Sequence, residues 1–177
     1  IPLSDFVGFI EGDSTKQNDI TQFVITSDLE TVFYDNLYLY KEEGSGGGSE
    51  ENIAAAPAPP TFTNASDFIS LFSNSSDDVT GVATNAYAGG QVSDVTVAGN
   101  IVKKLTTANA GSGFQFTFPP QDLTDGYTHV YFDMYVAGSV DAGEVLNINI
   151  QAGTSANIFT SFDPGALGTD KWVTVDM

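Results

Sequence analysis

Apolar and polar residues alternate one by one in several short stretches of this chain. The pattern is clearest at residues 113–118, 129–136 and 145–151, and it also runs through 22–26 and 31–40. Because successive side chains on a β-strand point to opposite faces, most of these stretches have one apolar face and one polar or aromatic face. The alternation therefore predicts strands that each bury one face.

Turn-forming residues separate these stretches, and helical patterns are almost absent. Glycine, asparagine, aspartate and proline recur between them, whereas aromatic and β-branched residues fill residues 31–40. One short helical turn is expected at residues 66–72, capped by Ser66. The spacing predicts an all-β fold, an antiparallel β-sandwich of the jellyroll type, and 177 residues are enough for one such core.

The chain is divided by a segment that has no core of its own. Residues 44–49 read GSGGGS, a flexible composition, and residues 50–60 read EENIAAAPAPP, in which proline favours extended backbone. We therefore expect a linker over residues 44–60, with residues 1–43 and 61–177 belonging to the same single domain.

The charge of the chain excludes several classes of partner. It carries 23 acidic residues against 5 lysines and no arginine, a formal charge of −18. Such a chain repels phosphate backbones, anionic lipids and anionic polysaccharides, so we expect neither nucleic acid nor a membrane as partner. Cysteine is absent, which excludes disulfides and thiolate metal sites. Neutral glycans and divalent cations remain compatible.

The two ends of the chain read as one phrase when the tail is placed before the head. The tail is KWVTVD and the head is IPLSDF; the other informative segments are VFYDNLYLYK, AAAPAPPTFTNASDFISLFSNSSDDVTGV, VSDVTVAGNIVKKL and YTHVYFDMYV. Together they resemble β-sandwich carbohydrate-binding modules that occur in tandem in polysaccharide-degrading surface proteins of marine Bacteroidetes. In that resemblance the tail-to-head phrase is the penultimate strand with its following turn, and VFYDNLYLYK is the last strand.

The resemblance implies a circularly permuted order. Residues 1–43 would be the last strands of the module, and residues 61–177 its opening and central strands. Two accounts fit this order: the old termini were joined by design through GSGGGS, or the chain is one period of a tandem array. In both, residues 1–43 dock onto residues 61–177, within one chain or by strand exchange between two. The resemblance also implies an extracellular or cell-surface location.

No pattern in the sequence marks a catalytic site. His129 is the single histidine, and we expect it to be a half-buried strand residue. The motifs G-x-S-x-G and H-E-x-x-H and the phosphate-binding loop are all missing. Acidic pairs are too common in so acidic a chain to indicate glycoside hydrolysis. We interpret the protein as non-catalytic.

The polar strand faces supply groups suited to the sugar binding that the resemblance implies. Aromatic rings cover the apolar face of a sugar, while amides and carboxylates bind its hydroxyls. The candidates on strand faces are Gln115, Tyr131, Asp133, Tyr135, Asn147 and Asn149, and those in the loop at 84–91 are Tyr87 and Gln91. The related modules commonly carry a tryptophan in that loop, where this chain has Tyr87. Trp172 is expected to pack rather than to bind.

Asp35 is the candidate metal ligand. The alternation places it on the same strand face as Phe33, Leu37 and Leu39, and a carboxylate buried among apolar residues needs a partner. The partner is either backbone amides or one structural Ca²⁺ of the kind that the related modules often hold.

These observations leave two functional hypotheses. The first is a non-catalytic module that binds a neutral polysaccharide, such as a β-glucan, through an aromatic and amide-bearing sheet face. The second is a structural spacer, or an engineered permuted scaffold, with little or no glycan binding.

Overall fold

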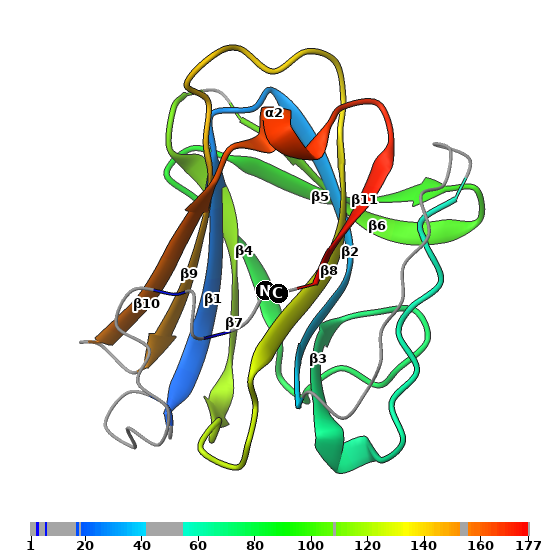
Figure 1. The fold of residues 1–177 in the computed structure, drawn as a ribbon, viewed down its shortest axis with the longest axis vertical. Coiled ribbons are helices and arrows are strands. Elements are labelled where there is room, and N and C mark those ends of the chain that lie inside the picture. Colours follow the sequence, from blue (N-terminus) through cyan, green and yellow to red (C-terminus); the bar gives the residue numbers. More distant parts are fainter. Residues whose placement is uncertain are drawn as a thin grey trace.

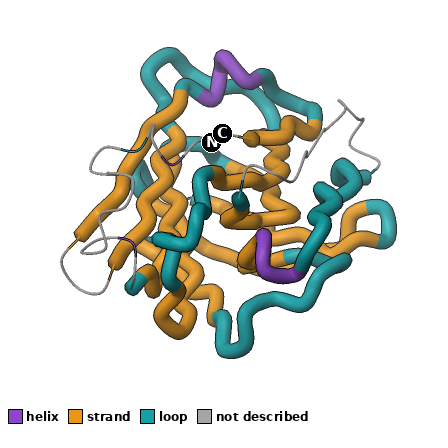
Figure 2. The backbone as a smooth tube through the Cα atoms, turned by 60° about the horizontal axis from the view of Figure 1, so that its bottom comes forward, coloured by secondary structure: helices purple, strands orange, loops and turns teal. Residues whose placement is uncertain are grey.

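The computed structural model describes residues 3, 6, 17, 19–41, 55–107, 109–152 and 156–176. Its elements in chain order are β1 (Ile20–Ser27), β2 (Thr31–Tyr40), η2 (Ala65–Asp67), β3 (Phe68–Phe72), β4 (Ala83–Tyr87), β5 (Gln91–Val97), β6 (Asn100–Thr106), β7 (Ser112–Gln121), β8 (His129–Val136), β9 (Leu146–Ala152), β10 (Ala156–Phe162), α2 (Pro164–Leu167) and β11 (Trp172–Asp176). Strands dominate, and helix contributes only short segments at the periphery (Figure 2). No helix in this part of the chain is long and apolar enough to cross a membrane.

The strands form two facing antiparallel sheets (Figure 1), which confirms the predicted β-sandwich. The five-stranded sheet has the order β10-β9-β1-β7-β4. The six-stranded sheet has the order β11-β8-β2-β6-β5, and β3 pairs with one end of β2. Strands from the first 41 residues therefore lie inside both sheets, β1 between β9 and β7 and β2 between β8 and β6.

The core lies between the sheets and is built from the apolar faces that the alternation predicts. Its buried members include Phe23 and Ile25 of β1, Phe114 and Phe116 of β7, Val130, Phe132 and Met134 of β8, and Ile148 and Ile150 of β9. Each buried side chain of this size contributes about 1.5–3 kcal/mol relative to full exposure. This shared core holds the two sheets together face to face.

A β-bulge in β2 overturns the predicted faces of that strand. Asp35 pairs with Asp133 but Tyr38 pairs with Tyr131, so β2 has one extra residue between these two pairs. Asn36 lies there with a φ of 50°. The side chains on either side of the extra residue are therefore out of phase with a regular alternation.

The bulge decides which residues of β2 reach the core. Tyr34, Leu37 and Leu39 belong to the main core, whereas Tyr38 and Tyr40 form a separate buried cluster with Tyr131. The expectation that Asp35 shares a face with Leu37 and Leu39 was wrong, because the extra residue at the bulge puts Leu37 and Leu39 in the core while Asp35 lies on the opposite face, beside Asp133.

The predicted helical turn at 66–72 is largely a strand. Residues 65–67 form one turn of 3-10 helix, and Asp67 Oδ2 accepts a hydrogen bond from the backbone N–H of Asn64 at 3.0 Å. From Phe68 onward the chain pairs with β2, Phe68 lying opposite Tyr40 and Ile69 opposite Leu39. Pairing with a neighbouring strand overrides the weak local preference for helix.

Two segments from opposite ends of the chain bond to β8 and to the residue that precedes it. In β11, Asp176 pairs with Tyr131 of β8. The backbone N–H of Leu3 donates a hydrogen bond at 2.5 Å to the carbonyl of Thr128, the residue before β8. The side chain of Leu3 is buried in the core.

The five-stranded sheet leaves no room for a side chain at residue 113. A Cβ added to Gly113 would lie 1.9 Å from the carbonyl oxygen of Ile25 in β1. We predict that Gly113→Ala lowers the free energy of unfolding by about 3 kcal/mol or more, since β1 and β7 must separate to admit the methyl group. Urea denaturation measures this loss.

Gly99→Ala is the matched control. Gly99 has a φ of 88°, but a Cβ there meets no atom within 4 Å. Its substitution should cost only the backbone strain of a left-handed residue, about 1–2 kcal/mol. Equal losses for the two variants would contradict the close contact at Gly113.

Candidate functional site

The outer face of the five-stranded sheet carries a patch of amide and hydroxyl side chains. We call it the amide face and define it by its residues: Gln22, Thr26, Asn85, Gln115, Thr117, Asn147, Asn149 and Gln151. They come from β1, β4, β7 and β9. In β1, β7 and β9 they alternate along the strand with buried residues, and Asn85 of β4 pairs with Gln115 of β7. All are at least partly exposed.

Strand register aligns these side chains in rows across the sheet. In the central row, Asn149 lies opposite Val24, Val24 opposite Gln115, and Gln115 opposite Asn85. A second row contains Gln151, Gln22 and Thr117. Directly paired residues on one face have Cβ atoms only about 4.5–5.5 Å apart, so paired polar groups in a row lie close together. In the central row the buried side chain of Val24 separates Asn149 from Gln115.

A third row ends in an aromatic ring. It runs from Asn147 through Thr26 and Gly113 to Tyr87, the last residue of β4. Tyr87 is 43% exposed, and in the described part of the chain only one other large hydrophobic side chain, Ile101, is as exposed. Because the close contact with Ile25 keeps residue 113 as glycine, no side chain stands between Tyr87 and Thr26 in this row.

The amide face retains unused hydrogen-bonding capacity. Asn149 Oδ1 is buried and accepts no hydrogen bond from the described residues. Asn147 Oδ1 accepts a bond from the hydroxyl of Ser161 at 2.6 Å, and Asn85 Nδ2 donates to the hydroxyl of Thr117 at 3.3 Å. A buried acceptor without a partner costs free energy, but a ligand on this face could bond to Asn149 Oδ1 only if the side chain first turned outward.

The structure thus brings together four of the predicted ligand-binding residues: Tyr87, Gln115, Asn147 and Asn149. Gln91 is exposed, but it begins β5 and therefore belongs to the six-stranded sheet.

The other three predicted residues, Tyr131, Asp133 and Tyr135, lie on the outer side of β8 but are covered. Their exposed fractions are 1%, 0% and 3%. The expectation that they form an open sheet face was wrong, because other parts of the chain pack over that face.

The cover is aromatic and comes from segments that flank the linker. Tyr131 packs with Tyr38 and Tyr40, and Phe62 and Phe68 lie against this cluster. Part of the expected linker contributes as well, since Pro57 is buried and accepts a hydrogen bond at its carbonyl. Residues 44–54 of that linker lie outside the described residues.

Tyr135 lies in a second covered cluster with Trp172. Their ring centroids are 5.8 Å apart, and Ala56 and Phe33 pack against the pair. Trp172 is 1% exposed. The prediction that Trp172 packs is confirmed.

Asp35 and Asp133 form a buried carboxylate pair beneath this cover, 1% and 0% exposed. Asp35 Oδ1 accepts the backbone N–H of Asn36 at 2.9 Å, and Asp35 Oδ2 accepts the side-chain amide of Asn100. Asp133 Oδ1 accepts the hydroxyl of Thr174 at 2.6 Å, and Asp133 Oδ2 accepts Nδ2 of Asn36 at 2.8 Å. All four carboxylate oxygens therefore receive a hydrogen bond from the protein.

These hydrogen bonds do not remove the charge of the pair. Neither carboxylate forms an ion pair with a lysine in the described part of the chain. Burial raises the pKa of Asp35 to about 6 against the opposing effect of its hydrogen bonds. Burial also raises the pKa of Asp133 to about 7, and the nearby charge of Asp35 adds to the increase. Two like charges out of water need a proton or a cation.

The pair offers a cation oxygen ligands of the right type. Besides the two carboxylates, the side-chain amides of Asn36 and Asn100 and the carbonyl of Pro57 lie in the same network. Calcium prefers such mixed oxygen ligands. Among the described residues, however, no group of three or more His, Cys, Asp or Glu gathers. Asp35 as a metal ligand therefore stays a prediction, now joined by Asp133.

Sequence reasoning missed part of the amide face. Gln22, Thr26 and Asn85 were not among the predicted site residues, although Gln22 and Thr26 alternate with the core residues Phe23 and Ile25 of β1. Alternation identifies the outward side of a strand, but it does not say which strands are neighbours. β1 and β4 are far from β9 in the sequence, so only the sheet order groups their side chains.

Comparison of the chain with protein-family models, curated proteins and solved structures found no match.

The buried carboxylate pair makes stability depend on pH. Both folded-state pKa values lie above the ordinary value of 3.8, so the folded protein binds more protons than the unfolded chain between about pH 4 and 7. The folded protein is therefore more stable at low pH, where both carboxyl groups are protonated, and this extra stability is lost as the pH rises through their folded-state pKa values. We predict that in EDTA the free energy of unfolding falls by about 2–4 kcal/mol from pH 5 to pH 8, measured by urea denaturation.

Asp133→Asn is the variant that tests the cause. The asparagine amide can still accept a hydrogen bond from Asn36 and donate one to the hydroxyl of Thr174. The substitution removes one negative charge of the pair. The variant should lose more than half of the pH dependence. An unchanged profile would assign the effect to His129 or to the overall charge instead.

Proposed function

We propose that this protein is a non-catalytic module that binds a neutral polysaccharide through the amide face and Tyr87. The observation that carries the proposal is the arrangement of Asn and Gln side chains in rows across four strands, ending in an exposed aromatic ring. Amides both donate and accept hydrogen bonds, which suits the hydroxyls of a sugar, and a tyrosine ring suits its apolar face.

The absence of charge on this face supports a neutral ligand. No acidic or basic residue occurs in the described rows, although the chain carries a formal charge of −18. A neutral glycan pays no electrostatic penalty there, whereas an anionic one meets the repulsion of the whole molecule. The open, shallow form of a sheet face also suits the side of a long chain, such as a β-glucan, rather than a small molecule. An extracellular or cell-surface location belongs to the same proposal.

The alternative function is a structural spacer or a permuted scaffold. It is favoured by the position of Leu3, which bonds to Thr128 just before β8, the strand with which β11 pairs, as expected if head and tail were once continuous. It is also favoured by the burial of Tyr131 and Tyr135, which leaves Tyr87 as the only aromatic ring of the predicted set available to a ligand.

Tyr87→Ala separates the two functions. We predict that the native protein is retarded in affinity electrophoresis through at least one neutral polysaccharide, and that Tyr87→Ala weakens the binding about tenfold. Loss of an aromatic platform costs about 1–2 kcal/mol, which corresponds to this factor.

Ile101→Ala is the control for lost exposed area. Ile101 is 45% exposed, nearly the same as Tyr87, but it lies in β6 of the other sheet. This variant should bind like the native protein. Absence of retardation on every glycan of a panel of β-glucans, mannans and xylans would favour the spacer.

We also propose that one Ca²⁺ binds at Asp35 and Asp133. A cation there would offset the repulsion of the buried pair. We predict that millimolar Ca²⁺ raises the melting temperature at pH 8 by about 5 °C or more and that EDTA reverses the rise. Asp133→Asn should abolish the response. A melting temperature that is the same in Ca²⁺ and in EDTA would leave a shared proton as the partner of the pair.

A further inference from the structure

A pocket of about 610 Å³ lies where η2 and β3 meet the end of β7. It is lined by η2 and β3, by the loop that follows β3, by the end of β7 and by the segment between β7 and β8. The residues that line it are Ala65, Phe68, Ile69, Ser70, Ser75, Ser76, Asp77, Asp78, Val79, Thr80, Gln121 and Tyr127. Its volume falls in the range of sites for small molecules.

The lining of this pocket is acidic and rich in hydroxyls. It contains the carboxylates of Asp77 and Asp78 and four Ser or Thr hydroxyls, and no lysine or histidine. Asp78 is held in place by the hydroxyl of Ser70, which donates to its Oδ1 at 2.6 Å. Lys103 acts on Asp78 from a distance, but its Nζ is paired with Asp94 at 2.6 Å. The pocket therefore favours a positive charge.

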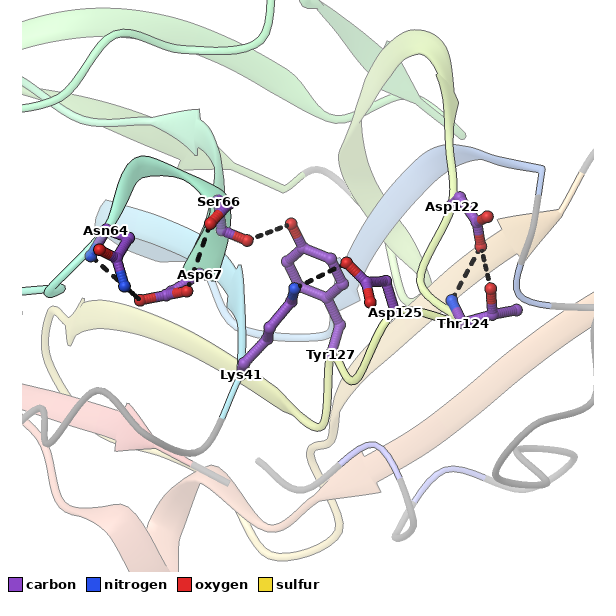
Figure 3. Close-up of polar contacts among 8 residues, drawn as sticks. All are labelled: Lys41, Asn64, Ser66, Asp67, Asp122, Thr124, Asp125 and Tyr127. Atoms are coloured by element: carbon purple, nitrogen blue, oxygen red, sulfur yellow. Dashed lines mark hydrogen bonds and ion pairs between the residues drawn. The ribbon is translucent and has the colours of Figure 1, made fainter.

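The aromatic part of the lining is fixed in position. The hydroxyl of Tyr127 donates a hydrogen bond to the carbonyl of Ser66 at 3.1 Å, which ties the ring to η2 (Figure 3). Phe68, which follows η2, lines the same pocket. Two aromatic side chains thus stand in one cavity with two carboxylates, and such a combination binds ammonium groups.

The protein already binds one amine beside this pocket in the same manner. Lys41 Nζ lies 5.0 Å from the centroid of the Tyr127 ring and 2.9 Å from Asp125 Oδ2 (Figure 3). A primary amine is therefore held there by a ring and a carboxylate together. The pocket offers a free amine the same two kinds of partner, with Asp77 and Asp78 in the place of Asp125.

We propose that this pocket binds a small hydroxylated molecule that carries a protonated amine, such as an amino sugar. The carboxylates hold the ammonium group, the Ser and Thr hydroxyls and Gln121 meet the ligand's hydroxyls, and Phe68 and Tyr127 cover its apolar side. This site is independent of the amide face, because the pocket would bind a positively charged ligand and the amide face a neutral one.

Glucosamine and glucose are the matched probes, because at one ring position glucosamine has a protonated amine and glucose a hydroxyl. NMR titration of the ¹⁵N-labelled protein at pH 6 should show glucosamine shifting the backbone signals of residues 75–80, 121 and 127. Glucose should bind at least about fivefold more weakly, the factor expected for one partly exposed ion pair. Added salt should reduce the difference.

Asp77→Asn tests the charge without disturbing the fold, because Asp77 is exposed. It should weaken glucosamine binding severalfold and leave glucose binding unchanged. Asp141→Asn, in the connection between β8 and β9, removes the same charge elsewhere and should have no effect. Equal binding of glucose and glucosamine, signals of the pocket that do not move, or an unchanged Asp77→Asn variant would each overturn the proposal. Binding of polysaccharide to the amide face would stand in any of these cases.

Discussion

Backbone pairing by two strands from the beginning of the chain holds the whole sandwich together. β1 is hydrogen-bonded to both β7 and β9, and β2 to β8, β6 and β3. Without β1, the two halves of the five-stranded sheet would have no common neighbour, and the rows of the amide face would be interrupted at Gln22 and Thr26. The segment that the sequence separates from the rest by a glycine-rich stretch is thus the one on which both sheets depend.

The strands and most of their faces could be predicted from the sequence, because alternation is a local property. Phe114 and Phe116, and likewise Ile148 and Ile150, face the core as predicted. The prediction failed where a bulge breaks the alternation and where other residues cover a face of the sheet. The bulge at Asn36 shifts the later part of β2 by one residue, and residues distant in sequence cover Tyr131.

The two outer faces of the sandwich differ because only one of them is covered. Pro57 is buried, and Phe62 and Phe68 pack against Tyr38, Tyr40 and Tyr131 of the six-stranded sheet, which form a second buried cluster. The same cover takes Asp35 and Asp133 out of water and raises their pKa values. The five-stranded sheet lies on the other side and keeps its polar side chains accessible. Aromatic content alone therefore pointed to the covered sheet, whereas amide content pointed to the open one.

The amide face does not depend on the contacts made by the two end segments of the described chain. Asp176 pairs with Tyr131 of β8, and Leu3 bonds to Thr128, the residue before that strand. β8 belongs to the six-stranded sheet, and none of the residues of the amide face lies on it. The rows of the amide face are instead set by the register of β9, β1, β7 and β4, because each of these strands is paired only within the five-stranded sheet.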